Sequence, residues 1–143
     1  DTTDGSIIWR LSVEDFTWAA PTIIDENVIV VNASGGVFVI NKASGDIAWS
    51  TDLTGEFTGS AVAIEDGFIV VSHEMEVSRF NIAEEKREWT RGLNLESDAG
   101  STPSTPVVVG DLILIPVAQS NEALLVAFDI EADVQWTYYP SEE

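Results

Sequence analysis

Residues 39–49 read V-I-N-K-A-S-G-D-I-A-W, and the same frame returns 40 residues later as R-F-N-I-A-E-E-K-R-E-W at residues 79–89. An earlier copy of this frame lies at residues 1–9, and a less regular copy ends at Trp136. The repeat tryptophans, spaced by 40, 40 and 47 residues, are Trp9, Trp49, Trp89 and Trp136. A strand-built repeat of this period predicts propeller blades, because one four-stranded sheet cannot bury both of its faces without a neighbouring copy.

Each repeat is predicted to hold four strands joined by turns rich in Gly, Asn, Asp and Ser. In the first repeat we expect strands over residues 21–24, 28–32, 37–41 and 47–50. No stretch combines helical spacing of apolar residues with freedom from helix breakers. The sequence therefore predicts an all-β fold, a partial β-propeller of three four-stranded antiparallel blades plus one leading strand.

The repeat frame also sets the expected boundaries within a single propeller fragment, residues 1–143. These are the outer strand of a preceding blade and then three blades, at residues 1–12, 13–52, 53–92 and 93–143. Propellers usually have four to eight blades, so we expect the ring to be completed by other protein chains or by the missing blades of a longer parent. The leading strand, Ser6–Leu11, needs partners for its backbone. We expect it to pair with another copy of the chain or to fold back onto the third blade, and we therefore predict self-association.

Residues 39–49 resemble the closing motif of the PQQ-like β-propeller repeat family, A-x-D-x-x-T-G-x-x-x-W, which is found in BamB-type and quinoprotein-like propellers. The second copy departs from it with Glu84-Glu85, and the third with Ala132-Asp133. The resemblance implies that the repeat tryptophans dock between blades and are structural. It also implies that quinone-dependent dehydrogenases of the family place a vicinal disulfide near their cofactor. This chain has no cysteine, so we expect no cofactor.

Composition restricts the partners and the setting. The chain carries 25 acidic and 6 basic residues, a net charge of −19. Such a field repels phosphate backbones and anionic bilayers, which excludes nucleic-acid binding and argues against direct membrane insertion. An acidic surface of this kind fits a periplasmic or extracellular location and is compatible with a saline-adapted organism.

Residues for catalysis or metal binding are sparse. The single histidine, His73, stands beside Glu74 in the second repeat and is interpreted as an exposed loop residue, so we expect no catalytic site. Asp129, Glu131 and Asp133 alternate and could offer carboxylates to calcium, but the glycine turn and the bidentate acid of a calcium loop are absent. We therefore expect no metal site.

The residues in the loops between strands favour a binding function. The loops entering each blade and the hairpins between its second and third strands should share one face of the propeller. The candidate interaction surface on that face, apolar residues among polar and acidic ones, is Phe16, Trp18, Phe57, Met75, Ser97 and Asp98. The alternative is that Trp18 and Phe57 pack beneath their own loops.

These features lead to the hypothesis of a non-catalytic propeller scaffold that mediates protein–protein interaction in the periplasm or outside the cell. Two alternatives remain open: a fragment of a quinoprotein-like, PQQ-dependent dehydrogenase, and the sensor domain of a membrane receptor.

Overall fold

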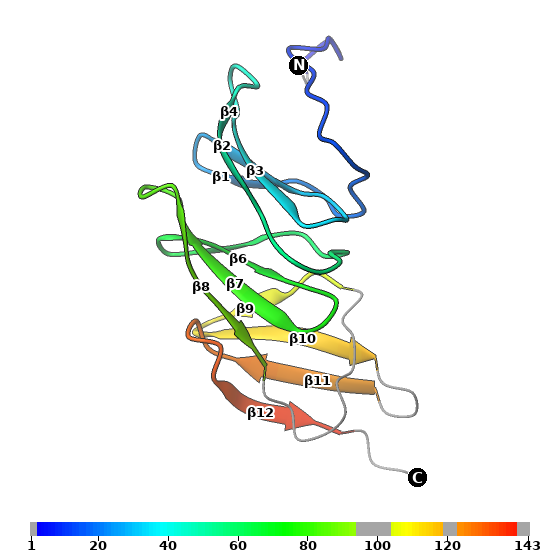
Figure 1. Cartoon of the computed structure of the whole chain (residues 1–143), viewed down its shortest axis with the longest axis vertical. Helices are drawn as coiled ribbons and strands as arrows, with labels where there is room; N and C mark the ends of the chain where they lie inside the picture. Colours follow the sequence, from blue (N-terminus) through cyan, green and yellow to red (C-terminus); the bar gives the residue numbers. More distant parts are fainter. Residues whose placement is uncertain (1–2, 94–103, 119–122, 140–143) are drawn as a thin grey trace.

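The computed structural model describes residues 3–93, 104–118 and 123–139 and shows three four-stranded sheets stacked along the long axis of the molecule (Figure 1). Every strand pairs antiparallel with its neighbour. In sequence order, the strands are β1 (Thr22–Ile24), β2 (Asn27–Val31), β3 (Gly36–Asn41), β4 (Ile47–Asp52), β5 (Val62–Ile64), β6 (Gly67–Val71), β7 (Glu76–Asn81), β8 (Lys86–Gly92), β9 (Val107–Val109), β10 (Leu112–Ala118), β11 (Ala123–Phe128) and β12 (Val134–Tyr138). The partial propeller predicted from the repeat is confirmed.

The turn between the third and fourth strands is built the same way in all three sheets. The Oδ1 atom of Asn41 accepts hydrogen bonds from the backbone N–H groups of Ala43 and Ser44, at 2.9 and 3.0 Å. In the second sheet the Oδ1 atom of Asn81 accepts the N–H of Glu84, and in the third the Oδ1 atom of Asp129 accepts the N–H groups of Glu131 and Asp133. A short side chain that bonds the backbone two or three residues ahead favours a tight turn. The three repeats therefore share a turn stabilised by a side-chain-to-backbone hydrogen bond as well as the sequence frame.

The backbone of the same turn keeps its conformation even where the glycine of the motif is missing. Gly45 has a φ of 79°, and its counterparts Glu85 and Ala132 have φ values of 53° and 66°. A residue with a Cβ atom is strained in this left-handed region, by roughly 1–2 kcal/mol. Glu85 and Ala132 thus adopt a conformation that the surrounding turn imposes on them.

Replacing Glu85 by glycine is therefore expected to raise the free energy of unfolding, by up to about 1 kcal/mol, because relief of strain outweighs the extra freedom of the unfolded chain. Urea denaturation measures this change. Glu84→Gly is the matched control, since it removes the same charge from the same turn at a position with no positive φ. Equal destabilisation by the two substitutions would contradict the prediction.

The hydrophobic core lies between the sheets in two clusters. The cluster between the first and second sheets is formed by Ile29, Val31, Val37, Val39, Leu53, Phe57, Ala61, Phe68, Val70 and Phe80. The cluster between the second and third sheets is formed by Ile69, Val71, Met75, Val77, Leu93, Ile113, Ile115, Val117, Val126, Phe128 and Ala132. The central strands of the second sheet contribute to both clusters, which explains why β6 is apolar at every position after its first glycine.

Two repeat tryptophans dock on the next sheet, as the family resemblance implies. The Trp49 ring, from the first sheet, lies 6.3 Å from Phe68 and 6.0 Å from Phe80 of the second, measured between centroids. Trp89 packs against the cluster shared with the third sheet. Trp136, on β12, is 42% exposed.

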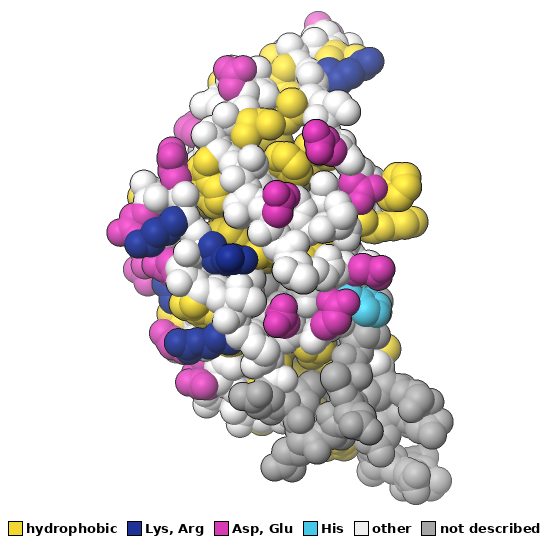
Figure 2. Space-filling model, viewed as in Figure 1, with side chains coloured by type: hydrophobic (Ala, Val, Ile, Leu, Met, Phe, Trp, Pro, Cys, Tyr) yellow, Lys and Arg dark blue, Asp and Glu magenta, His cyan; other side chains and the backbone are white. Residues whose placement is uncertain are grey.

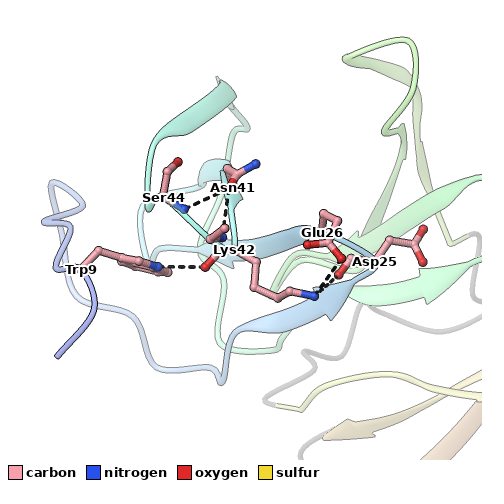
Figure 3. Close-up of polar contacts among 7 residues, drawn as sticks. Trp9, Asp25, Glu26, Asn41, Lys42 and Ser44 are labelled. Carbon is pink, nitrogen blue, oxygen red and sulfur yellow. Dashed lines mark hydrogen bonds and ion pairs between the residues drawn. The ribbon is translucent and has the colours of Figure 1, made fainter. Parts of the chain in front are cut away.

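The leading segment differs from its prediction. Residues 3–21 contain no strand, because a strand needs a neighbour for its backbone hydrogen bonds and no described strand pairs with this segment. Trp9 nevertheless docks on the first sheet, so folding back onto the third blade, one of the two expected arrangements, is wrong, and pairing with another copy of the chain stays a prediction. Its indole N–H donates to the carbonyl of Lys42 at 2.9 Å (Figure 3), and its ring fills the space over Gly45. Among the described residues, no helix is long and apolar enough to cross a bilayer.

Candidate interaction face

Backbone hydrogen bonds join the loops entering the first two blades to the hairpins between the second and third strands of these blades. The N–H of Ala33 donates to the carbonyl of Phe16 at 2.9 Å, and 40 residues later the N–H of His73 donates to the carbonyl of Glu56 at 2.7 Å. The N–H of Phe57 donates to the carbonyl of Ala33 at 3.1 Å, which links the second loop back to the first hairpin. These loops therefore form one connected face at one end of the sheets.

Phe16 and Trp18 are the large apolar side chains that this face exposes. They are 73% and 71% exposed, and their ring centroids lie 6.2 Å apart with the ring planes tilted by 56°. The Asp15 carboxylate accepts the backbone N–H of Phe16 at 2.8 Å and so fixes the loop beside the pair. Beside them is an open groove of about 550 Å³ that spans the first two blades, lined by Asp15, Phe16, Trp18, Ala33, Ser34, Gly55, Glu56, Phe57 and Thr58.

Two of the residues predicted for the surface are buried instead. Phe57 is 4% exposed and belongs to the cluster between the first and second sheets. Met75 is 2% exposed and belongs to the next cluster. Both sit where a loop crosses the end of an inter-sheet core, and burying a large apolar side chain there stabilises the fold by about 1.5–3 kcal/mol. Packing beneath the loop, the alternative considered for Phe57, is what the structure shows. Ser97 and Asp98 lie outside the described residues.

Carboxylates surround the aromatic pair. Asp15 and Glu56 line the groove, and an Oε atom of Glu74 lies 2.7 Å from the point where a Cβ atom on Gly55 would stand. Within the described part of the chain, none of these three acids forms an ion pair, and no Lys or Arg lines the groove. Figure 2 shows hydrophobic side chains protruding at one edge of the molecule with acidic side chains above and below them.

His73 is half-buried, not exposed as expected. Its backbone is held by the bond to Glu56, and its Nδ1 atom is buried without a hydrogen-bond partner among the described residues. Figure 2 shows the histidine, in cyan, beside acidic side chains. The hairpin that carries His73 is bonded to the loop entering the same blade, and this close approach explains the difference.

The acidic residues considered as calcium ligands, Asp129, Glu131 and Asp133, lie in a turn that the Asp129 side chain stabilises. Asp129 accepts the backbone N–H groups of Glu131 and Asp133 at 3.1 and 3.0 Å, and its second oxygen accepts the Gln135 amide at 2.7 Å. Over residues 3–93, 104–118 and 123–139, no three His, Asp or Glu side chains are grouped so that they could hold a metal ion.

The loops expected on this face contain Asp15, Gly55 and Glu56, but the groove residues Ala33, Ser34 and Thr58 were missed. A usable signal was present in the 40-residue frame. Phe16 and Glu56 occupy equivalent loop positions, and Ala33 and His73 equivalent hairpin positions, so the loop-to-hairpin pairing could have been predicted as a set.

Comparisons with known proteins agree with this fold. The sequence profile described as "Outer membrane protein assembly factor BamB" matches residues 1–141. A search of curated proteins gives no match.

Among solved structures, the chain is similar to BamB from Moraxella catarrhalis, with 19% identity and a TM-score of 0.73 over 92% of this chain and 40% of that one. It is similar to a europium-containing methanol dehydrogenase, with 13% identity and a TM-score of 0.79 over 96% and 27% of the two chains. For the quinohemoprotein alcohol dehydrogenase ADHIIG from Pseudomonas putida HK5, the values are 13% identity and a TM-score of 0.77 over 94% and 22%. The chain thus spans less than half of each of these proteins, and these identities show a common fold alone. With the profile match over nearly its whole length, the chain belongs to the PQQ-like β-propeller family described as outer membrane protein assembly factor BamB.

Proposed function

We propose that this protein is a non-catalytic scaffold that binds other protein chains through its loop face, in the periplasm or outside the cell. The observation that carries the proposal is the exposed Phe16–Trp18 pair beside a groove between two blades. Aromatic residues are enriched where proteins bind one another, and tryptophan is frequent among the residues that contribute most to affinity.

The loops that carry the pair are held in place before any partner arrives. Phe16 is fixed through its own N–H by Asp15 and through its carbonyl by Ala33, and Ala33 in turn holds Phe57. A surface whose backbone is already ordered loses less conformational entropy on binding than a mobile loop does. This arrangement supports recognition by a rigid scaffold. The family description, which names a factor for outer membrane protein assembly, supports the proposed location.

Selection from a random peptide library displayed on phage tests the binding function. We expect the wild-type protein to enrich peptides, and we expect Trp18→Ala to reduce their binding about 30-fold or more, since loss of a central aromatic residue commonly costs 2 kcal/mol or more. Tyr138→Ala, which removes an exposed aromatic residue from β12, is the matched control and should leave binding unchanged. Peptides that bind both variants equally, or no enrichment at all, would contradict the proposal.

The dehydrogenase alternative makes the opposite prediction for cofactor binding. A ligand that binds only the native state raises the melting temperature by mass action. Because this chain lacks the cysteine pair of the quinoprotein site, we expect calcium and pyrroloquinoline quinone, together or separately, to leave the melting temperature unchanged in a thermal scan. A saturable upward shift would favour the enzyme.

A further inference from the structure

The chemistry around the Phe16–Trp18 pair indicates which kind of chain it binds. Both rings are more than two-thirds exposed, so their faces are open to an incoming group. The electron-rich face of an indole or phenyl ring attracts a cation placed within about 6 Å of its centre. The ring pair by itself is thus suited to a positively charged side chain as well as to an apolar one.

The charges beside the pair favour the cation. Asp15 and Glu56 line the same groove, Glu74 lies against Gly55 in its wall, and none of the three is neutralised by a described Lys or Arg. An anionic or purely apolar partner would bury these carboxylates without compensation, which is unfavourable. A partner carrying positive charge would compensate them and would also be drawn in by the net charge of −19.

Planar guanidinium groups suit this site better than ammonium groups. A guanidinium stacks on aromatic faces and forms two parallel hydrogen bonds to a carboxylate, whereas an ammonium acts as a point charge. Here aromatic rings and carboxylates line one groove of about 550 Å³, a volume within the range of sites that enclose a ligand group.

Resting on the proposed function, we infer that the groove beside Phe16 and Trp18 binds an arginine-bearing segment of a partner protein, with the guanidinium over the aromatic pair and against the carboxylates of Asp15 and Glu56. This assigns a class of partner to the loop face. It also separates the groove from the rest of the acidic surface, which attracts cations without aromatic contact.

The test is fluorescence anisotropy with a fluorescein-labelled peptide that alternates three arginines with glycines, in 0.15 M NaCl. The comparison probe is the same peptide with citrulline, which keeps the shape and removes the charge. We expect the arginine peptide to bind at least 10-fold more tightly than the citrulline peptide. Trp18→Ala should weaken its binding about 2- to 30-fold, the range for a lost cation–π contact, and Glu56→Gln about 2- to 5-fold.

Two control variants separate the groove from general attraction to an acidic protein. Tyr138→Ala removes an exposed aromatic residue elsewhere, and Glu65→Gln removes an exposed acid from the β5–β6 turn; both should leave the affinity unchanged. Equal binding of the arginine and citrulline peptides would overturn the inference, as would equal losses in groove and control variants. If library peptides without arginine still require Trp18, protein binding stands and only the partner class is wrong. If neither probe nor library peptide depends on Trp18, both proposals fail.

Discussion

Phe80→Ala is expected to lower the free energy of unfolding by about 3–5 kcal/mol, the usual cost of removing a fully buried phenyl ring. Phe80 is completely buried, stacks on Phe68 with a centroid distance of 4.8 Å, and receives the Trp49 ring from the first sheet. Its removal leaves a cavity between two sheets that pack against each other through their side chains. Collapse would require the sheets to shift as units, so little of the cavity can close.

Urea denaturation followed by tryptophan fluorescence measures the loss, and it also reports whether Trp49 has left its site. Phe16→Ala is the matched control, because it deletes the same ring from an exposed position and should change stability by less than about 0.5 kcal/mol. Similar losses in the two variants would mean that the Trp49–Phe68–Phe80 group does not hold the sheets together.

Gly67→Ala is expected to destabilise the protein by about 3 kcal/mol, near the upper end for forcing extra atoms into a packed core. A Cβ atom at Gly67, on β6, would overlap the carbonyl oxygen of Phe80 on β7. The obstacle is backbone and not a movable side chain, so the β6–β7 ladder itself must shift. The second sheet is packed on both faces, which leaves it little room to do so.

Gly92→Ala provides the comparison, because Gly92 ends the outer strand β8 and a Cβ atom there meets nothing within 4 Å. Its effect on the thermal midpoint should be close to zero or slightly stabilising, since alanine reduces the freedom of the unfolded chain. If Gly67→Ala melts at the same temperature as Gly92→Ala, the close approach between β6 and β7 does not constrain this position.

The repeat made most of the fold predictable. Four expected strands of the first repeat correspond to β1–β4 within one or two residues at their ends, and the docking of Trp49 and Trp89 follows from their places in the frame. This success has a physical basis, because turns are set by local residues and strands by apolar runs between turns. The turn residues and the apolar runs both lie within a few positions of the turn or strand that they predict.

The candidate surface was harder to predict because burial in a loop depends on what the loop crosses. Trp18 and Phe57 are both aromatic residues in loops that enter a blade, yet one is exposed and the other fills the end of an inter-sheet core. Met75 takes the position of Gly35, and only the three-dimensional packing shows that its side chain turns inward. The prediction for the leading segment was wrong for a related reason. Its sequence repeats that of a strand, but a strand forms only where another strand pairs with it.

The docking of Trp9, Trp49 and Trp89, each on the sheet that follows it, also bears on how such a gene changes length. A duplicated segment of one repeat period carries one docking tryptophan and one surface that receives a tryptophan, wherever within the repeat the duplication begins. Duplication or loss of a whole period therefore leaves the tryptophans between neighbouring sheets matched to a receiving sheet. The longer spacing before Trp136 arises from a longer connection between β8 and β9 and from β10, which has two residues more than β6. Recombination between neighbouring repeats is thus a route by which members of this family gain or lose blades without redesigning a core.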